Sequence, residues 1–465
     1  MRMTDVDLVV AGAGGGLGGA LRAAQLGARV LVVEANPHFR RGNNTSMSTA
    51  MVPGAGSRFQ RSAGIEDSPA NFLDDIAHKT GSAAEPTIAK ALAEVSAELV
   101  EWLADGVGMP IELPTDFAYP GHSVPRVHSI PGRHGSVLLG YLADAVAAHE
   151  LIDLLVPAKL VAVRHEASTY AAVIEQPNGS REEISTGAVL LATNGYGADP
   201  GAVREHLPEI AGATYHGSEY STGDALRIGA ELGATTGFLD AYQGHAALSP
   251  AARTLVTWTT IMHGAILVDS RGSRFGDETI GYSEYAALLV ARPGATGWIV
   301  LDERIHELSL PFTDYQQVLE SGAVRSAGSV AELAALIDVD PATLAAELEE
   351  ASAVANGEKP ADRFGRQVFP AALRAPYRAV RVIPALFHTQ GGLLVDEHAQ
   401  VLSTGGAPID GLYAAGGAAA GISGHGAAGY LAGNGLLPAL GLAYLAATHA
   451  ARRSVHPTNT ERSHA

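Results

Sequence analysis

The stretch from Asp7 to Glu34, DLVVAGAGGGLGGALRAAQLGARVLVVE, constrains the fold of this chain more than any other. An apolar segment leads through clustered glycines into an alanine-rich segment, and a second apolar segment follows. This order predicts a strand, a turn, a helix and a second strand, whose turn glycines let the backbone approach a pyrophosphate at the helix N-terminus. Glu34 ends the second strand, at the offset where a carboxylate accepts ribose hydroxyls. The predicted dinucleotide contacts are Gly12, Gly14, Gly15, Gly16 and Glu34.

The glycine register inside this motif stays open. Gly12 and Gly14 fit the first two places of G-x-G-x-x-G, whereas the third place falls on Leu17, with a glycine on either side. A Gly-rich turn alone is also consistent with a purely structural role. The two flanking strands and the terminal acid favour dinucleotide binding.

Composition narrows the classes of protein to consider. The 465 residues are enough for two domains with sizeable cores. A net charge of −18 argues against a nucleic-acid surface and against an anionic membrane face. The absence of cysteine excludes disulfides, thiolate metal sites and cysteine nucleophiles. No signal segment precedes the first strand and no long apolar span follows, so we expect a soluble, cytoplasmic protein without a membrane span.

Further glycine-rich and polar motifs follow in a fixed order. A loop with Gly42, Asn43, Asn44, Thr45 and Ser48 comes after the second strand, VLLATNGYG ends at Gly197, and GLYAAGG starts at Gly411. Together these motifs resemble the fumarate reductase/succinate dehydrogenase flavoprotein superfamily, which also contains the 3-ketosteroid Δ1-dehydrogenases. The resemblance covers nearly the whole chain and implies that the cofactor is FAD.

The resemblance also implies how the FAD is held. Asn44 stands where covalent members of the family have a histidine, so we expect non-covalent FAD. Gly417 stands where the family usually carries a glutamate after A-A-G. The implied cofactor contacts beyond the first motif are Asn43, Asn44, Thr45, Ser48, Ala192, Thr193, Asn194, Gly195, Asp224, Gly416, Gly417, Asn434 and Gly435.

The expected fold class is α/β, a Rossmann-like FAD-binding domain with an inserted α+β cap domain. The glycine-rich pattern stops after residue 237 and returns at about residue 385. We therefore expect the FAD-binding domain in residues 1–237 and 385–452, the cap or substrate domain in 238–384, and a disordered tail in 453–465.

The segment YPGHSVPRVHSIPGRH, residues 119–134, interrupts a mostly helical region. By resemblance, His128 and Gly132 lie in a loop near the flavin. Without cysteine or metal-ligand spacing, its histidines are interpreted as polar loop residues, and no metal site is predicted.

Substrate positions follow from two further motifs. YQGHAALSP places Gln243 and His245 at the family's substrate-binding positions, and His388 before TQGG matches its second substrate histidine. The arginines of fumarate reductases do not survive: Tyr282 and Tyr430 replace them, and Trp258 and Ile261 replace the proton relay. Fumarate reduction by that relay is therefore not expected, and Trp258 and Ile261 are interpreted as apolar pocket wall.

Tyrosine at both positions is the arrangement of the 3-ketosteroid Δ1-dehydrogenases. Desaturation beside a ketone removes an α-proton and passes a β-hydride to the flavin. The resemblance assigns the base to Tyr282 and the carbonyl-binding group to Tyr430 with the backbone N–H of Asn434, an oxyanion-hole role. Tyr119 is a further candidate, and His245 and His388 tune the site or bind a second polar group.

The predicted activity is therefore an FAD-dependent dehydrogenase that desaturates a cyclic ketone, either a 3-ketosteroid or an oxocyclohexane carboxylate. The electron acceptor stays unknown. An alternative is a fumarate-reductase-like ene-reductase of an activated alkene. A flavoprotein that has lost catalysis and serves in binding or redox sensing is a third.

Overall fold

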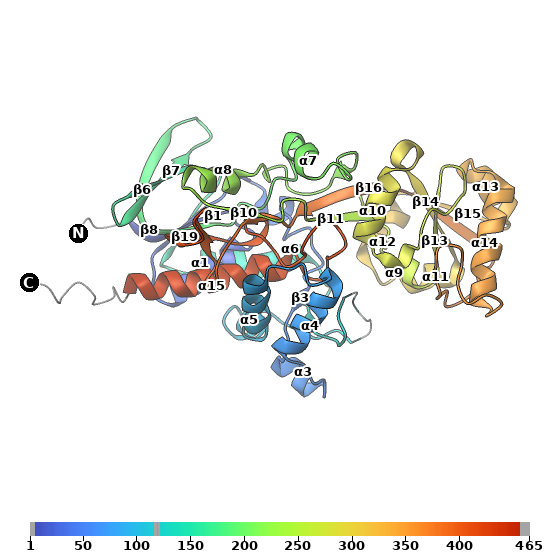
Figure 1. Cartoon of the computed structure of the whole chain (residues 1–465), viewed down its shortest axis with the longest axis horizontal. Coiled ribbons are helices and arrows are strands. Elements are labelled where there is room, and N and C mark those ends of the chain that lie inside the picture. Colours follow the sequence, from blue (N-terminus) through green and yellow to red (C-terminus); the bar gives the residue numbers. More distant parts are fainter. Residues whose placement is uncertain (1–4, 116–118, 120, 456–465) are drawn as a thin grey trace, which may run out of the picture. The chain divides into compact units, whose positions relative to one another are not determined.

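The computed structural model describes residues 5–115, 119 and 121–455 (Figure 1). The chain divides into two compact units. The first comprises Met1–Leu207, Gly217–Tyr242 and His388–Ala465, and the second comprises Pro208–His216 and Gln243–Phe387. The sequence-based division placed 208–216 in the first domain. These residues group with the second because β9 (Thr214–Tyr215) pairs with β16 (Tyr377–Thr389).

The first unit is built on an eight-stranded sheet in the order β18-β19-β8-β1-β2-β5, with β6 and β7 joined to β8. The pairs β1–β2, β1–β8, β2–β5 and β8–β19 are parallel. The sheet strands are β1 (Val6–Ala11), β2 (Val30–Val33), β5 (Ile152–Leu155), β6 (Lys159–Glu166), β7 (Thr169–Glu175), β8 (Arg181–Leu191), β18 (Gln400–Leu402) and β19 (Pro408–Ala414).

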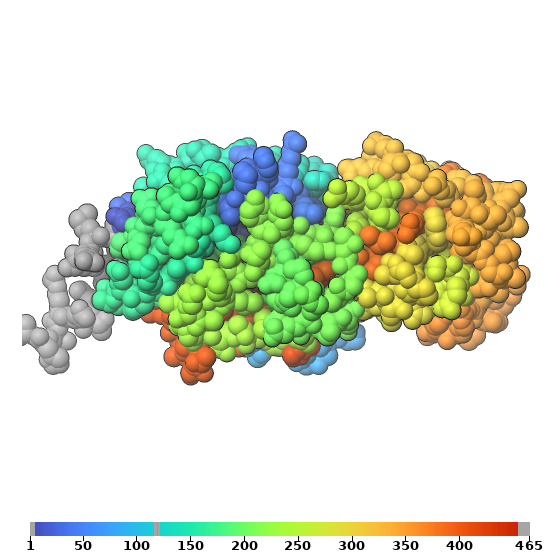
Figure 2. Space-filling model, turned by 90° about the horizontal axis from the view of Figure 1, so that it is seen from above, coloured from blue at the N-terminus to red at the C-terminus, as the bar shows by residue number. Residues whose placement is uncertain are grey.

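Helices pack on this sheet, and four short strands form two separate two-stranded sheets, β3–β4 and β10–β17. In Figure 1, α15 (red) runs alongside α1, and Figure 2 shows the green segments with α7 and α8 at the surface of this unit. The helices are α1 (Gly16–Gln25), α2 (Phe39–Gly42), α3 (Arg58–Ser62), α4 (Pro69–Thr80), α5 (Pro86–Asp105), α6 (Gly135–Ala147), α7 (Pro200–His206), α8 (Asp224–Glu231), η3 (Gly416–Ala418) and α15 (Leu436–Val455). The short strands are β3 (Val52–Pro53), β4 (Val127–His128), β10 (Thr236–Gly237) and β17 (Gly392–Leu393).

The second unit has a largely antiparallel sheet in the order β12-β11-β16-β14-β13, with β9 and β15 on β16. Its strands are β9, β11 (Tyr242–Ser249), β12 (Thr254–Leu255), β13 (Ile266–Asp269), β14 (Gly297–Asp302), β15 (Val324–Ala327) and β16. Its helices are α9 (Thr259–Met262), η1 (Glu278–Ile280), α10 (Tyr282–Val290), η2 (Pro293–Ala295), α11 (Glu303–Ser309), α12 (Thr313–Glu320), α13 (Val330–Ile337) and α14 (Pro341–Ala355).

The predicted α/β class is confirmed, because the first unit has the parallel Rossmann-like order and the second is α+β. At the C-terminus, α15 extends to Val455, so residues 453–455 of the predicted tail are helical. Arg453 in this last turn forms an ion pair with Asp410, and Ala450 and Ala451 just before it are buried. Residues 456–465 of that tail lie outside the described part of the chain.

Candidate active site

The glycine turn between β1 and α1 is shaped by close backbone approaches. Gly12 has a φ of +105°, and a Cβ at this position would lie 2.3 Å from the carbonyl oxygen of Ala192. A Cβ at Gly15 would lie 2.3 Å from the carbonyl oxygen of Ala439 in α15, and one at Gly16 would lie 2.8 Å from Val10 Cγ1. Each of these glycines is therefore required by a different close contact. Gly16, which packs against Val10 of β1, fills the helix–strand packing place of the motif rather than Leu17.

Glu34 follows β2 and its carboxylate lies against the turn. Its two oxygens accept hydrogen bonds from the N–H groups of Ala13 and Asn36, each at 2.6 Å. Burial raises the pKa of Glu34, and these backbone bonds oppose the rise. The carboxylate is thus held beside the glycine turn, as the ribose-binding prediction requires.

The polar loop after α2 folds back on itself and on other segments. Asn43 Oδ1 accepts from the Ser46 N–H at 2.9 Å, and Ser48 Oγ donates to the Thr45 carbonyl at 2.7 Å. Asn44 Oδ1 accepts from the Ser218 N–H at 2.9 Å. A Cβ at Gly14 would lie 3.0 Å from Thr45 Oγ1, so this loop lies next to the glycine turn.

The turn after β8 lies in the same region. Asn194 adopts a φ of +63°, donates from Nδ2 to Ser221 Oγ at 2.9 Å and accepts from the Gly195 N–H at 2.9 Å. A Cβ at Gly417 would lie only 2.4 Å from Asn194 Oδ1. It would also lie 2.8 Å from the backbone nitrogen of Gly195, so these contacts exclude a side chain at residue 417 and account for the glycine where the family usually carries a glutamate.

Two of the predicted FAD contacts, Asp224 and Gly416, lie at the starts of short helices. Asp224, the first residue of α8, forms an ion pair with Lys159 at 2.9 Å and accepts from Thr222 Oγ1 at 3.1 Å. Its carboxylate is therefore already paired within the protein. Gly416 begins η3 with a φ of +62°, and a Cβ there would lie 3.4 Å from Ala439 of α15.

Buried polar atoms in these loops fit a bound dinucleotide. Within the described residues, Asn43 Nδ2 and Thr193 Oγ1 are buried and have no hydrogen-bond partner. Both belong to loops predicted to hold FAD, and a buried donor without a partner costs about 1–3 kcal/mol. A polar ligand bound at the glycine turn would provide hydrogen-bond partners for both atoms.

His388 and Tyr430 come together in the first unit. Their ring centroids lie 6.1 Å apart in an edge-on arrangement. A Cβ at Gly435 would lie 3.2 Å from His388 Nε2 and 4.0 Å from the Tyr430 hydroxyl. A side chain at residue 435 would therefore crowd the two polar groups that approach this glycine. We call His388, Tyr430 and Gly435 the first half-site.

The predicted oxyanion donor Asn434 is engaged elsewhere. Its N–H donates to the Leu431 carbonyl at 3.1 Å, because residues 431–434 form a turn before α15. Its side chain is buried and donates from Nδ2 to Ser423 Oγ at 2.6 Å. The N–H of Gly435 comes next in the chain, at the start of α15, where backbone N–H groups lack intrahelical acceptors.

Tyr119 packs beside the same stretch, whereas His128 does not. Tyr119 clusters with Val127 and Ala432, and its hydroxyl lies 3.4 Å from Arg133 Nη1. His128 is fully buried, with Nδ1–H donating to the Arg126 carbonyl and Nε2 accepting from Ser57, both at 2.8 Å. Since both its ring nitrogens are satisfied, His128 has a structural role.

His245 and Tyr282 come together in the second unit, as the second half-site. Their rings stack, with centroids 4.7 Å apart and planes at 16°. Tyr282 is the first residue of α10, after Gly281 with a φ of +134°. His245 Nδ1 accepts from the Ala247 N–H at 3.1 Å, which leaves the proton of the neutral ring on Nε2.

Both histidines, His245 and His388, are neutral at pH 7. Burial lowers the pKa of His245 to about 3, with a further contribution from the charge of His216. Burial likewise lowers the pKa of His388 to about 4. Each ring can therefore exchange hydrogen bonds with a ligand, but neither supplies a positive charge to balance a carboxylate.

Trp258 is more than the apolar wall that the sequence indicated. Its ring contacts His245 edge-on, with centroids 5.8 Å apart, and lies near Tyr282 at 6.4 Å. Its Nε1 is buried and has no hydrogen-bond partner in the part of the chain that the structure describes. Ile261 is fully buried and apolar, as expected. The residue type at 258 could have indicated this donor, because a buried indole N–H usually finds a partner.

A buried charge network anchors the segment before Tyr282. Arg274 donates from Nε and Nη2 to the two oxygens of Glu278 at 2.8 and 2.6 Å. Arg366 donates to Glu278 at 2.9 Å, and Arg274 also binds Asp362 at 2.7 Å. Glu278 starts η1, four residues before Tyr282, so this network fixes the chain entering α10.

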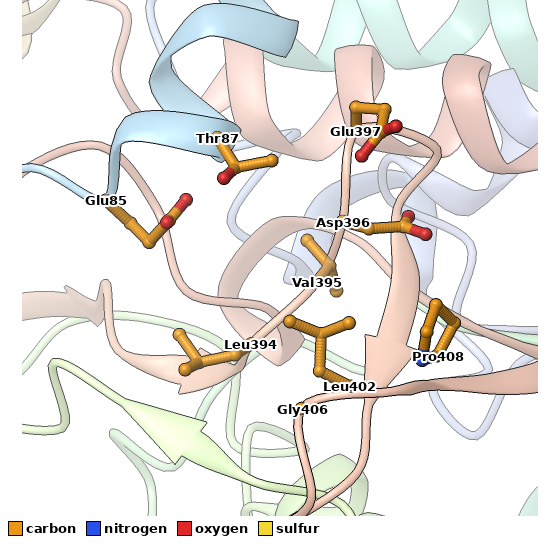
Figure 3. Close-up of a pocket in the computed structure, with 9 residues that line it drawn as sticks. All are labelled: Glu85, Thr87, Leu394, Val395, Asp396, Glu397, Leu402, Gly406 and Pro408. Atoms are coloured by element: carbon orange, nitrogen blue, oxygen red, sulfur yellow. The ribbon is translucent and has the colours of Figure 1, made fainter.

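A surface pocket of the first unit carries none of the predicted site residues. Its volume is about 360 Å³, and Glu85, Thr87, Asp396 and Glu397 are among its lining residues (Figure 3). Two of its carboxylates have local structural roles: Glu85 caps α5 through the Ile88 N–H at 2.7 Å, and Asp396 accepts from the Gln400 N–H at 2.8 Å. The described residues contain no cluster of His, Asp and Glu suited to a metal ion.

Comparison with known proteins places the chain in a family. The family described as FAD binding domain matches residues 7–436. The chain belongs to this flavoprotein family. It is therefore an FAD-dependent oxidoreductase, and the glycine turn, Glu34 and the loops described above form an FAD-binding fold of the fumarate reductase/succinate dehydrogenase type.

Relatives in this family include fumarate reductases. The chain is 31% identical over 432 residues to the NADH:fumarate oxidoreductase of Klebsiella pneumoniae, covering 90% of this chain but only 45% of that protein. It is similar to the open conformation of a flavocytochrome c3 fumarate reductase, with a TM-score of 0.82 and 27% identity over 97% of this chain and 78% of the other.

The fold is also that of a steroid enzyme. The 3-ketosteroid Δ1-dehydrogenase of Sterolibacterium denitrificans superposes with a TM-score of 0.76 and 22% identity, covering 96% of this chain and 99% of that chain. This likeness concerns the fold alone.

Among the described residues, no helix has the length and apolar character needed to cross a membrane.

Proposed function

We propose that this chain desaturates a cyclic ketone at the carbons α and β to its carbonyl. The observation that carries the proposal is that each half-site pairs a tyrosine with a neutral histidine: Tyr282 with His245, and Tyr430 with His388. A ketone is uncharged and needs hydrogen-bond donors and a base, which these groups can supply.

In this proposal, Tyr430 and the start of α15 hold the ketone oxygen. The Tyr430 hydroxyl and the N–H of Gly435 donate to it and stabilise the enolate that develops when the α-proton leaves. Gly435 takes the place first given to Asn434, because the Asn434 N–H already donates to Leu431. His388 Nε2 also approaches Gly435, and in this proposal it is a further polar group next to the ketone oxygen.

In this proposal Tyr282 is the general base: its phenolate oxygen, formed when the hydroxyl proton has left to solvent before the reaction, takes the α-proton and becomes the hydroxyl. When bound, FAD supplies the acceptor for the β-hydride, so the substrate loses one proton and one hydride and gains a C=C bond. His245 Nε2–H and Trp258 Nε1–H offer two neutral donors beside Tyr282. They suit a second acceptor group on the substrate.

The test is an anaerobic titration of the FAD-loaded protein with cyclohexanone, 4-oxocyclohexane carboxylate and a 3-ketosteroid, followed by flavin absorbance. We expect one of these ketones to bleach the flavin. Tyr282→Phe is expected to slow bleaching by about 10²–10⁴-fold with FAD still bound, since a general base contributes that much. Tyr285→Phe, at a buried tyrosine of the same helix whose hydroxyl lies 3.4 Å from the Gly276 carbonyl oxygen, is the matched control.

An ene-reductase acting on an activated alkene is the alternative, and the fumarate reductases among the relatives favour it. Its signature differs from that of a desaturase. If no ketone bleaches the flavin but an enone or unsaturated acid reoxidises the chemically reduced protein, the ketone proposal and the base role of Tyr282 are both wrong. If neither substrate class reacts although FAD binds tightly, a non-catalytic binding or redox-sensing role remains.

A further inference from the structure

Three buried side chains of the first unit form a polar chain behind the first half-site. Asn434 donates from Nδ2 to Ser423 Oγ at 2.6 Å, and Ser423 Oγ donates to Gln390 Oε1. Asn434, Ser423 and Gln390 are only 2%, 2% and 4% exposed. Of the three, only Asn434 was among the residues that the sequence indicated.

Ser423, the middle residue, fixes the direction of the hydrogen bonds along this row of polar side chains. The Ser423 hydroxyl has a single proton, and because its oxygen accepts from the Asn434 amide, that proton goes to Gln390 Oε1. The oxygen side of the Gln390 amide thus faces Ser423, and its Nε2 points away from the chain. Gln390 Nε2 is buried and has no partner in the described ranges of the chain. This amide nitrogen can donate two hydrogen bonds, and no described residue accepts either of them.

The backbone of Gln390 is clamped on both sides. Its N–H donates to the Ala241 carbonyl at 2.7 Å, and its carbonyl accepts from the Gly421 N–H at 2.8 Å. A Cβ at Gly195 would lie 1.9 Å from the hydroxyl oxygen of Thr389, the preceding residue. The loops 192–195, 389–392 and 416–423, which carry FAD motifs, therefore meet around Gln390.

Gln390 adjoins the first half-site and lies in a different loop from Glu34. Glu34, the ribose-binding carboxylate, is held at the glycine turn. Gln390 is two residues from His388 in the chain, and its partner Asn434 adjoins Gly435, so the polar chain backs directly onto the first half-site. The part of FAD that reacts is its ring system.

We propose that the amide nitrogen of Gln390 donates a hydrogen bond to an acceptor atom of the flavin ring. The reduced ring carries more electron density than the oxidised ring, so a donor held against it binds the reduced form more tightly. Gln390 therefore raises the midpoint potential of the bound flavin. This role goes beyond the proposed function and does not depend on which substrate the protein uses.

The experiment measures the midpoint potential of the FAD-loaded full chain, without substrate, against reference dyes under anaerobic conditions. Gln390→Met keeps the length of the side chain and removes the donor. We expect the ratio of reduced to oxidised flavin at a fixed potential to fall about tenfold, a shift of about −30 mV for a two-electron couple. Gln390→Glu, which puts a carboxylate at the same place, is expected to lower the potential further.

Gln400→Met is the matched control, since Gln400 is also a buried glutamine of this unit but lies on β18, and its potential is expected to equal that of the wild type. An unchanged potential in both Gln390 variants, with FAD retained, overturns the proposal. An unchanged potential together with faster FAD dissociation also overturns it, because the amide then contacts another part of FAD. Should Gln390→Met lose FAD on purification, Gln390→Glu alone decides the outcome by the same criteria.

Discussion

At the scale of single residues, the neutral state of the histidines shapes the chemistry. His245 and His388 are desolvated and uncharged, and a tautomer-fixing bond from Ala247 makes His245 a donor at Nε2. Arginines at the same family positions would offer charge, whereas tyrosines offer hydroxyls that can donate or accept. The residue types thus favour a substrate whose charge develops during the reaction over one that arrives with two charges.

Tyr430→Phe tests the carbonyl-binding role at this scale. Loss of one oxyanion donor costs about 10²–10³-fold in kcat, so we expect flavin reduction by the active ketone to slow by that factor with unchanged FAD absorbance. Stopped-flow absorbance measures the rate. Tyr141→Phe, at an exposed position of α6, is the control and is expected to match the wild type. A Tyr430→Phe rate within threefold of the wild type would contradict the role.

At the scale of elements, the packing of α1 against α15 sets the position of the half-site. Gly15, Gly18 and Gly19 face α15, where added Cβ atoms would meet Ala439, Leu440 and Ala443. Because α15 begins directly after Gly435, the distance between the two helices decides where the Tyr430–Gly435 stretch lies. Gly15 and the first glycines of α1 thus shape the turn and also set the position of Tyr430 and Gly435.

The pair Gly15→Ala and Gly18→Ala separates these effects. A Cβ at Gly15 would lie 2.3 Å from a backbone oxygen, which cannot move without α15, whereas one at Gly18 would lie 3.2 Å from the flexible end of Leu440. We expect Gly15→Ala to lower the free energy of unfolding by about 1–3 kcal/mol or more, and Gly18→Ala to change it by less than about 1 kcal/mol. Urea unfolding of the FAD-loaded protein measures both. Equal losses of unfolding free energy in the two variants would contradict this account, because the close contact between Gly15 and α15 would then have no special cost.

At the scale of the whole molecule, buried histidines couple stability to pH. His128 is fully buried, and burial lowers its pKa to about 4 from 6.5. Between these values the unfolded chain binds a proton that the folded chain does not, so stability falls as pH drops from about 6.5 to 4. The bond that protonation disrupts is the one from Ser57 to Nε2, which holds β4 against α3.

We therefore expect the wild type to lose about 1.4 kcal/mol of unfolding free energy per pH unit from His128 alone across this window. His128→Gln is expected to be less stable at pH 7 and to show a flatter decline between pH 6.5 and 5. Chemical unfolding at several pH values measures the slopes. His78→Gln, at an exposed position of α4, should keep the wild-type slope. Parallel curves for His128→Gln and the wild type would contradict this account.

The sequence by itself determined the fold class, the cofactor and the residue types of the site. Periodicity and glycine spacing are local properties, so they predict β1, α1 and β2 and the acid that ends them. The motifs around Asn43, Asn194 and His388 are equally local, and their resemblance to a flavoprotein superfamily implies FAD.

Only the tertiary structure decided which atoms are already engaged. The Asn434 N–H is used by a turn, the Asp224 carboxylate by Lys159 and both nitrogens of His128 by neighbours, whereas Trp258 Nε1 and Gln390 Nε2 are left without partners among the described residues. Such pairing depends on segments far apart in the chain and on burial, neither of which a one-dimensional pattern contains. A hydrogen-bond donor becomes informative only when the fold has placed every other group around it.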